Sequence, residues 1–239
     1  LDRVHRAGDC RVIEREFVNY SDFKNWAIPQ ASHAWVLVLD ADERVTPELA
    51  AEIQRLLAEP PVGRDAFEIR RRNFFMYREA RFGPWLNDRV WRLFRRDVCR
   101  YRDCRVHESL EVEPGRGGRL REPLLHYTVT SYDEYLAKLL NYTEWGAADR
   151  WDAGRRASLF KMAVVPFTRF AWLYFVRGGF LDGAVGLQTC ILQAFLITFL
   201  KEARLWERGL GEAQAAEATA VLKFKGSPAV AKAAAQRAA

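Results

Sequence analysis

The sequence predicts an α/β protein whose mostly parallel sheet is flanked by helices. The run from Trp35 to Leu39 is short, rich in β-forming residues and uncharged, as is typical of a strand that is buried on both faces of a parallel sheet. A helix should follow, because Thr46 is a favoured N-cap residue and Pro47 suits the first helical position. Helical and strand patterns alternate in this way up to Pro60, which favours a parallel α/β arrangement.

Three acidic residues, Asp40, Asp42 and Glu43, are expected in the loop between this strand and this helix. In an open α/β sheet such loops lie at the carboxyl edge of the strands, where ligands bind. The carboxylates of Asp40 and Asp42 can reach one hard cation from the same side. Mg²⁺ and Mn²⁺ favour such oxygen ligands and leave positions for substrate phosphates. The alternative is an acidic loop that only caps the helix, and the buried strand before it favours the metal site.

Three chemistries use acids at such a place. A calcium loop of the EF-hand type is excluded, because Arg44 and Val45 stand where that loop needs an oxygen ligand and a glycine. A phosphatase of the haloacid dehalogenase type also has D-x-D after a strand, but it expects Thr or Val in place of Arg44 and a later acidic pair, and the chain contains no adjacent Asp-Asp. The third is a nucleotide-sugar glycosyltransferase, in which D-x-D holds a metal against the diphosphate.

The composition is that of a globular protein with an anionic partner. The chain has 239 residues, of which 49% are hydrophobic and 28% charged, and its net charge is +6. Phosphate, membrane and nucleic acid are all compatible with this charge. The chain begins at Leu1 without a signal peptide, so we expect a fragment or a processed product.

The four cysteines do not form a disulfide framework, and a reducing compartment is the simpler interpretation. Cys99, Cys104 and His107, with His126 as a fourth ligand, are the one combination to consider as a zinc site. Structural zinc sites bring their cysteines into tighter pairs, so scattered thiols are favoured.

The pattern along the chain predicts three parts: an α/β domain at residues 1–130, C-terminal helices at residues 131–208 and a low-complexity tail at residues 209–239. Gly183 to Leu200 carries no charged residue and just reaches the length of a membrane-spanning helix. Its glutamines and glycines favour a shallowly inserted hairpin, or a helix packed on the domain, over a true span. The Ala-rich tail is expected to be frayed. Arginines crowd the end of the α/β domain: Arg70, Arg71, Arg72, Arg78, Arg81, Arg89, Arg92, Arg95, Arg96, Arg100, Arg102 and Arg105.

Five segments in order resemble the inverting family 2 glycosyltransferases of the GT-A fold, and most closely the β-glucosyltransferase group of lipopolysaccharide core biosynthesis. The segments are FVNYSDFKNWAIPQASHAWVLVLDADERVTPELAAEI (Phe17–Ile53), DRVWRLFRR (Asp88–Arg96), VHESLEV (Val106–Val112), PLLHYTVTSYDEYLAKL (Pro123–Leu139) and RGGFLDGAVGL (Arg177–Leu187). The resemblance covers about Leu1 to Glu207. It implies a GT-A, Rossmann-like sheet whose first strand, with a nucleotide-contacting loop, would precede Leu1. We therefore expect the sequence to be truncated at its N-terminus; the alternative is a chain that cannot hold a nucleotide fully.

The resemblance implies a metal-dependent transfer of a hexose from a nucleotide sugar such as a UDP-hexose, and glucose is the favoured hexose. Asp42 and Asp40 would hold Mg²⁺ or Mn²⁺, and His126 could approach the metal from the far side. Lys24 and Asn25, with Asp40, would contact the nucleotide; exposed positions on a helix are the alternative for Lys24 and Asn25.

A base must accept the proton of the acceptor hydroxyl. Glu108 in VHESL is the first candidate, and Asp88 in NDRVW is the second. For each of them the alternative is an ion pair with one of the neighbouring arginines. His107 would polarise Glu108, or pack in the core.

The partners expected from the resemblance are a nucleotide sugar, a saccharide or lipid-linked acceptor and an anionic membrane surface. The arginine-rich stretch suits phosphorylated headgroups or core sugars, and no nucleic-acid-binding motif accompanies it. We therefore expect a peripheral protein on the cytoplasmic face of the bacterial inner membrane that does not bind nucleic acid. The rival is a non-catalytic, membrane-associated remnant of a sugar transferase.

Overall fold

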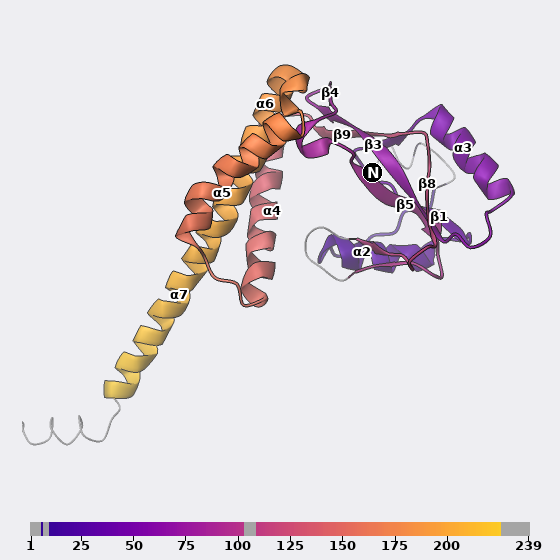
Figure 1. Ribbon diagram of the computed structural model, residues 1–239. Coiled ribbons are helices and arrows are strands. Elements are labelled where there is room, and N and C mark those ends of the chain that lie inside the picture. The colour runs from indigo at the N-terminus through magenta and orange to yellow at the C-terminus, as the bar shows by residue number, and fades with distance from the viewer. Residues whose placement is uncertain (1–5, 7–9, 103–108, 226–239) are drawn as a thin grey trace, which may run out of the picture. The chain divides into compact units, whose positions relative to one another are not determined.

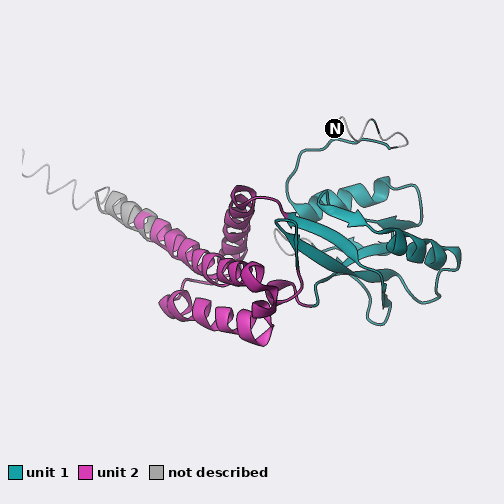
Figure 2. Ribbon diagram, turned by 90° about the horizontal axis from the view of Figure 1, so that it is seen from above, with its two compact units in different colours: residues 1–79, 87–128 teal, residues 80–86, 129–239 magenta. Residues whose placement is uncertain are grey.

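The computed structural model describes residue 6 and residues 10–102 and 109–225. The chain divides into two compact units (Figures 1 and 2). The sheet unit comprises residues up to 79 and residues 87–128, and the helical unit comprises residues 80–86 and those from 129 onward. The short segment 80–86, which begins with the last residue of β4, is thus grouped with the helices rather than with the sheet. The sequence pattern does not predict this division.

Among the described residues, the sheet unit contains one larger sheet, a two-stranded ribbon, two α-helices and one 3-10 helix. Its helices are α2 (Tyr20–Ala27), η1 (Ile28–Gln30) and α3 (Pro47–Ala58). Its strands are β1 (Trp35–Leu37), β2 (Glu43–Val45), β3 (Ala66–Phe75), β4 (Arg78–Ala80), β5 (Arg89–Arg95), β6 (Arg100–Tyr101), β7 (Leu110–Glu111), β8 (Gly117–Arg119) and β9 (Leu124–Val129).

The predicted α/β class, with helices flanking a central sheet and an apolar helical C-terminal part, is confirmed. The strand order is β1-β5-β3-β9-β2, with β4 and β8 paired to β3. The sheet is mixed: β3–β8 is a parallel pair, whereas β1–β5, β3–β5 and β2–β9 are antiparallel.

The apolar residues of β1 pack on both faces of the strand. Trp35 and Leu37 pack against the core that Leu49 and Phe67 belong to, and the alternate residue Val36 packs against a second core on the opposite face. Packing on two faces was therefore predicted correctly for Trp35–Leu37, but β1 ends at Leu37, and Leu39, the last residue of the predicted run, is 42% exposed. Strand direction was not encoded in that run, since its described partner β5 is antiparallel.

The start of α3 follows the predicted capping chemistry. The Thr46 hydroxyl accepts a hydrogen bond from the Leu49 amide at 3.1 Å, and Pro47 occupies the first turn. One expectation needs correction: Glu43 is not in the strand-to-helix loop but begins β2, where it lies opposite His126 of β9. The acidic segment is therefore a tight connection between two strands, and it is closed by the Glu43 amide bonding the Asp40 carbonyl at 3.0 Å.

Removing the Thr46 hydroxyl should weaken this helix start. We expect Thr46→Ala to lower the free energy of unfolding by about 1 kcal/mol, because an N-terminal amide of α3 loses its acceptor. Urea unfolding measures the change, and Thr46→Ser, which keeps the hydroxyl, is the matched control. An equal loss in both variants would contradict the capping role.

The helical unit is formed by α4 (Tyr132–Asp152), α5 (Leu159–Ala171), η3 (Trp172–Val176), η4 (Gly179–Asp182), α6 (Gly183–Ile191), η5 (Leu192–Ile197) and α7 (Thr198–Lys225), with the short η2 (Gly83–Trp85). Segment 80–86 is fixed to the turn that joins η3 to η4. Asp182 accepts hydrogen bonds from the amides of Arg81 and Phe82, each at 2.8 Å, and the Arg177 guanidinium donates to the Gly83 and Leu86 carbonyls.

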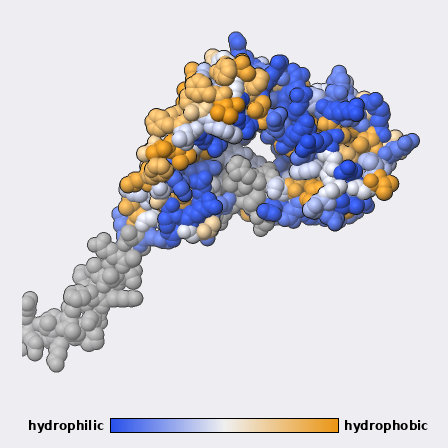
Figure 3. Space-filling view, in the orientation of Figure 1, coloured by the Kyte–Doolittle hydropathy of each residue, from blue (hydrophilic) through white to orange (hydrophobic). Residues whose placement is uncertain are grey.

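Large apolar side chains remain exposed on the helical unit (Figure 3). Leu159–Val176 and Gly179–Glu212 are long and apolar enough to cross a membrane, judged by length and composition only, and 11% and 28% of their most apolar stretches are buried. α7 continues beyond Gly209 to Lys225, so the first part of the expected tail is helical. Alanine has the highest helix propensity, which explains why this Ala-rich stretch extends the helix.

Candidate functional site

An irregularity in β5 aims an arginine at the acidic loop. Along the β3–β5 pair Phe67 is opposite Leu93 and Glu68 is opposite Trp91, so Arg92 is an extra residue in a β-bulge. Bulges redirect side chains and are frequent beside active sites. Arg92 is 4% exposed, although arginine is rarely buried without partners.

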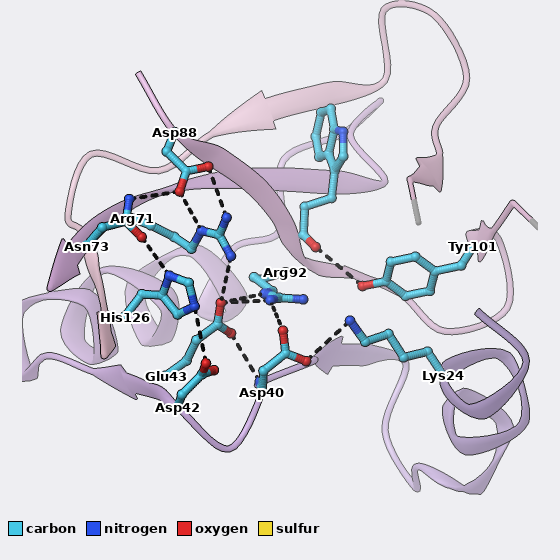
Figure 4. Close-up of polar contacts among 11 residues, drawn as sticks. Lys24, Asp40, Asp42, Glu43, Arg71, Asn73, Asp88, Arg92, Tyr101 and His126 are labelled. Atoms are coloured by element: carbon cyan, nitrogen blue, oxygen red, sulfur yellow. Dashed lines mark hydrogen bonds and ion pairs between the residues drawn. The ribbon is translucent and has the colours of Figure 1, made fainter. Parts of the chain in front are cut away.

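Arg92 is held by two of the three acids that the sequence singled out (Figure 4). Its Nη2 donates to Asp40 Oδ2, and to Glu43 Oε1 at 2.7 Å. A second guanidinium, Arg71, approaches the same Glu43 oxygen at 3.6 Å. The other oxygen of Glu43 accepts from the Asp40 amide at 3.1 Å, so Glu43 links Arg92 to the backbone of the loop.

This charge network sets the protonation of its members. Burial favours the neutral form of Asp40, but the positive charges of Arg92 and Lys24 outweigh it and hold the pKa of Asp40 below its usual value. Burial also opposes the charge on Arg92, and the carboxylates of Asp40 and Glu43 more than offset it, so the pKa of Arg92 is raised.

A second chain of contacts runs from Asp88 to Asp42. Arg71 Nε and Nη2 donate to the two Asp88 oxygens at 2.9 and 3.0 Å, and Asn73 Nδ2 donates to Asp88 Oδ2 at 2.8 Å. This fixes the Asn73 amide so that its Oδ1 faces His126 Nδ1 at 2.6 Å. On the other side of the ring, His126 Nε2 lies 3.4 Å from Asp42 Oδ2.

These contacts decide which nitrogen of His126 carries hydrogen. Asn73 Oδ1 can only accept, so His126 Nδ1 must donate to it. In the neutral imidazole the Nε2 lone pair then points at a carboxylate oxygen. A cation shared by this lone pair and the Asp42 carboxylate would satisfy both acceptors.

Lys24 and Asn25 are adjacent in α2 but contact different parts of the sheet unit. The Lys24 ammonium lies 3.2 Å from Asp40 Oδ1 and 5.3 Å from the centre of the Tyr101 ring. The Asn25 side chain is engaged by the backbone of Tyr101, donating to its carbonyl at 2.8 Å and accepting from its amide at 2.9 Å. Lys24 therefore faces the acidic loop, whereas Asn25 fixes α2 to β6.

The predicted site residues are thus partly brought together. Asp40, Asp42, Lys24, Asp88 and His126 belong to one connected set of polar contacts (Figure 4). Asp88 takes the ion pair that was the alternative to its role as base. Asn25 is held by the backbone of Tyr101, and its expected contact with the nucleotide stays a prediction.

Several candidates lie outside the described residues: Cys104, His107 and Glu108. The described Cys99 is a buried free thiol. Within the described ranges no group of three or more His, Cys, Asp or Glu side chains is placed to hold a metal, so Asp42 and His126 would need ligands from the substrate or water.

Arg92, Arg71 and Asn73 were missed as site residues. One signal was present: a charged residue inside VWRLF, an otherwise apolar strand pattern, must be paired if it is buried. Asn73 gave no signal, because only the three-dimensional pairing of β3 with β9 brings it to His126.

Comparison with known proteins identifies relatives along most of the chain, although no protein-family model matches it. The chain is 29% identical over 201 residues to the lipopolysaccharide core biosynthesis glycosyltransferase LpsC of Rhizobium meliloti, covering 83% of this chain and 73% of that protein. It is 28% identical over 223 residues to an uncharacterized glycosyltransferase of Rickettsia typhi, covering 87% of this chain and 75% of the relative. A Rickettsia conorii relative with the same description is 26% identical over 214 residues.

The fold and the relatives agree with one class of protein. The structure has an α/β sheet with an acidic loop, followed by apolar helices, and the relatives are named glycosyltransferases. The chain is related over most of its length to glycosyltransferases. The resemblance to the lipopolysaccharide-core type that the sequence indicates is confirmed by the similarity to LpsC.

Proposed function

We propose that this protein is an inverting hexosyltransferase that moves a hexose from a UDP-sugar to a lipid-linked or lipopolysaccharide-core acceptor. Glucose is the favoured hexose. The observation that supports it most is the facing pair of Asp42 and His126 beside the Arg92–Asp40–Lys24 cluster, in a chain related to glycosyltransferases. Donor, acceptor and the family 2 assignment are part of this proposal.

The Asp42–His126 pair fits a divalent cation such as Mn²⁺ or Mg²⁺. Its donor set is one carboxylate oxygen and one imidazole nitrogen, and the Asn73 contact holds the imidazole in the tautomer that leaves Nε2 as a ligand. When bound there, such an ion supplies positive charge against the diphosphate leaving group. Asp40 is the weaker candidate ligand, because both of its oxygens are already in ion pairs.

The other residues have roles in binding and proton transfer. Lys24 and Asp40 would contact the nucleotide sugar from α2 and the acidic loop. Glu108, from its place in the sequence, would accept the proton of the attacking acceptor hydroxyl. Asp88, bound by Arg71 and Asn73, would hold His126 through Asn73 rather than act as the base.

Metal binding can be tested apart from turnover. Mn²⁺ added to the complete natural protein should bind without donor, and His126→Ala should weaken it about tenfold or more, since removing a metal ligand or its orienting partner costs at least that much. Paramagnetic resonance of free Mn²⁺ measures the binding. His33→Ala, which removes an exposed histidine before β1, is the control. Equal Mn²⁺ binding by wild type and His126→Ala would remove the proposed metal site.

The membrane part of the proposal rests on the exposed apolar side chains of the helical unit. Phe160, Phe167 and Phe175 are 70%, 64% and 63% exposed, and Trp172 carries the Arg177 guanidinium 5.0 Å above its ring. Rings and cations together suit the headgroup level of a bilayer. We propose that these helices lie in the cytoplasmic surface of the inner membrane rather than crossing it.

Flotation with liposomes tests this attachment. Phe167→Asp should weaken binding to phosphatidylglycerol-containing liposomes about tenfold or more, because a buried Phe contributes about 1.5–3 kcal/mol. Val62→Asp changes a fully exposed residue of the sheet unit and is the matched control. Equal flotation of both variants and the wild type would contradict the proposed surface.

A further inference from the structure

One face of the sheet carries arginines and aromatic rings that the proposed chemistry does not use. Side chains alternate along β3, so Arg70, Arg72 and Phe74 lie on the face opposite Arg71 and Asn73. Arg89 lies directly opposite Arg70 in the antiparallel β3–β5 pair and therefore shares its face. We call the set of Arg44, Arg70, Arg72, Arg89, Phe74 and Tyr127 the arginine face.

Aromatic rings stack on part of this face. Tyr127 of β9 stacks on Phe74, with ring centres 4.8 Å apart and planes at 17°. Arg44 lies 4.9 Å over the Tyr127 ring, and Arg72 lies 5.9 Å from the Phe74 ring. Each of these two guanidinium groups therefore has an aromatic partner on this face.

The charges on this face do not balance. Glu79 pairs with Arg72 through two contacts of 2.9 and 3.2 Å, and it is the one carboxylate within the described ranges that is paired with these four arginines. Arg70 and Arg89 are like charges in directly opposed positions, an arrangement that destabilises a sheet.

Arg89 also has a polar atom without a partner. Its Nη1 is buried and has no hydrogen-bond acceptor in the described structure. A buried donor without an acceptor costs about 1–3 kcal/mol, and more where the group is charged. An opposed cation pair with an unsatisfied guanidinium nitrogen is explained if an anion supplies the missing acceptors.

We propose that the arginine face binds a phosphate ester carried by the saccharide acceptor, with Arg70 and Arg89 as its main contacts. Guanidinium groups match the oxygens of phosphate in pairs of hydrogen bonds, whereas the ring faces of Phe74 and Tyr127 are already covered by each other and by arginines. This assignment rests on the proposed function and names the chemical class of its acceptor.

Binding of glucose 6-phosphate, with glucose as the uncharged control, tests the site in the complete natural protein without donor and with EDTA present. Arg70→Gln and Arg89→Met should each weaken glucose 6-phosphate binding about tenfold, the loss of one charge-assisted pair. Arg55→Gln removes the same charge from an exposed position on α3 and should change nothing. Because metal and donor are absent, failure of the transferase proposal would not produce this result.

Thermal unfolding supplies a readout that a structural role would not give. Without phosphate, both variants should unfold at the same temperature as the wild type or higher, because a repulsive pair is removed. Glucose 6-phosphate should raise the unfolding temperature of the wild type and of Arg55→Gln, but not of the two variants.

Unchanged glucose 6-phosphate binding in both variants would overturn the site. A loss of stability in both without phosphate would make the arginines structural. Binding to liposomes that contain phosphatidic acid is measured for the same variants. If they bind these liposomes more weakly than the wild type but bind glucose 6-phosphate normally, the phosphate belongs to a lipid headgroup and the saccharide assignment is overturned.

Discussion

Asp42→Ala and Glu108→Gln are expected to fail at different steps of the transfer. Asp42 lies 3.4 Å from His126 and is the loop carboxylate best placed to share a cation with it. Its loss should weaken the binding of Mn²⁺ with UDP and lower turnover roughly a hundredfold, since about 3 kcal/mol of charge stabilisation is removed. Glu108→Gln should bind UDP and Mn²⁺ normally, because the amide keeps the shape, and should lose about a hundred- to ten-thousandfold in turnover.

Calorimetry with UDP and Mn²⁺, beside a turnover assay on the complete natural protein, separates the two steps. Asp42→Asn and Glu108→Asp are the conservative controls: the first should retain part of the binding, and the second part of the turnover. Near-normal turnover by Glu108→Gln would move the base elsewhere. Unchanged metal dependence in Asp42→Ala would remove the cation from this loop.

The sequence predicted what depends on neighbours along the chain. Thr46 and Pro47 start α3 as expected, because capping involves residues a few positions apart. The packing of Trp35–Leu37 on two faces was also readable, because an uncharged run requires it. The antiparallel direction of its partner β5 could not be predicted, since hydrophobicity carries no information on whether a paired strand is parallel or antiparallel.

The site depends on partners that are distant in sequence, and here the prediction was incomplete. The acidic loop was identified from its composition and position, but not the bulge that turns Arg92 into it, because a bulge is a property of two paired strands. For Asp88 the sequence offers a base or an ion pair; the structure shows the ion pair with Arg71, which lies close to it only in the folded sheet. Asn25 shows the same limit, because its partner Tyr101 is far along the chain.

The largest expected effect on stability is at Glu43. Its side chain is fully buried and bonds Arg92 Nη2 at 2.7 Å and Nε at 3.2 Å, with Arg71 at 3.6 Å. Glu43→Gln would leave buried positive charge with Asp40 alone, and breaking a buried pair from one side costs about 3–5 kcal/mol. Glu68→Gln breaks the more exposed pair with Arg119 and should cost no more than about 1 kcal/mol.

Acid should act on the same network. The pKa of Asp40 is held below its usual value by Arg92 and Lys24 against the effect of burial, so the stabilisation from Asp40 is present above about pH 4, the unfolded value, and is lost as pH falls through the lower folded pKa. Urea unfolding at pH 7 and at descending pH measures both effects. In Arg92→Met the acid-dependent loss of stability should shrink, because Asp40 keeps only Lys24 as a cation partner.

The double variant Glu43→Leu/Arg92→Met should recover part of the stability lost in Glu43→Gln, because an apolar pair replaces a buried charge without its partner. Equal losses from Glu43→Gln and Glu68→Gln would show that the buried cluster contributes no more than a surface ion pair.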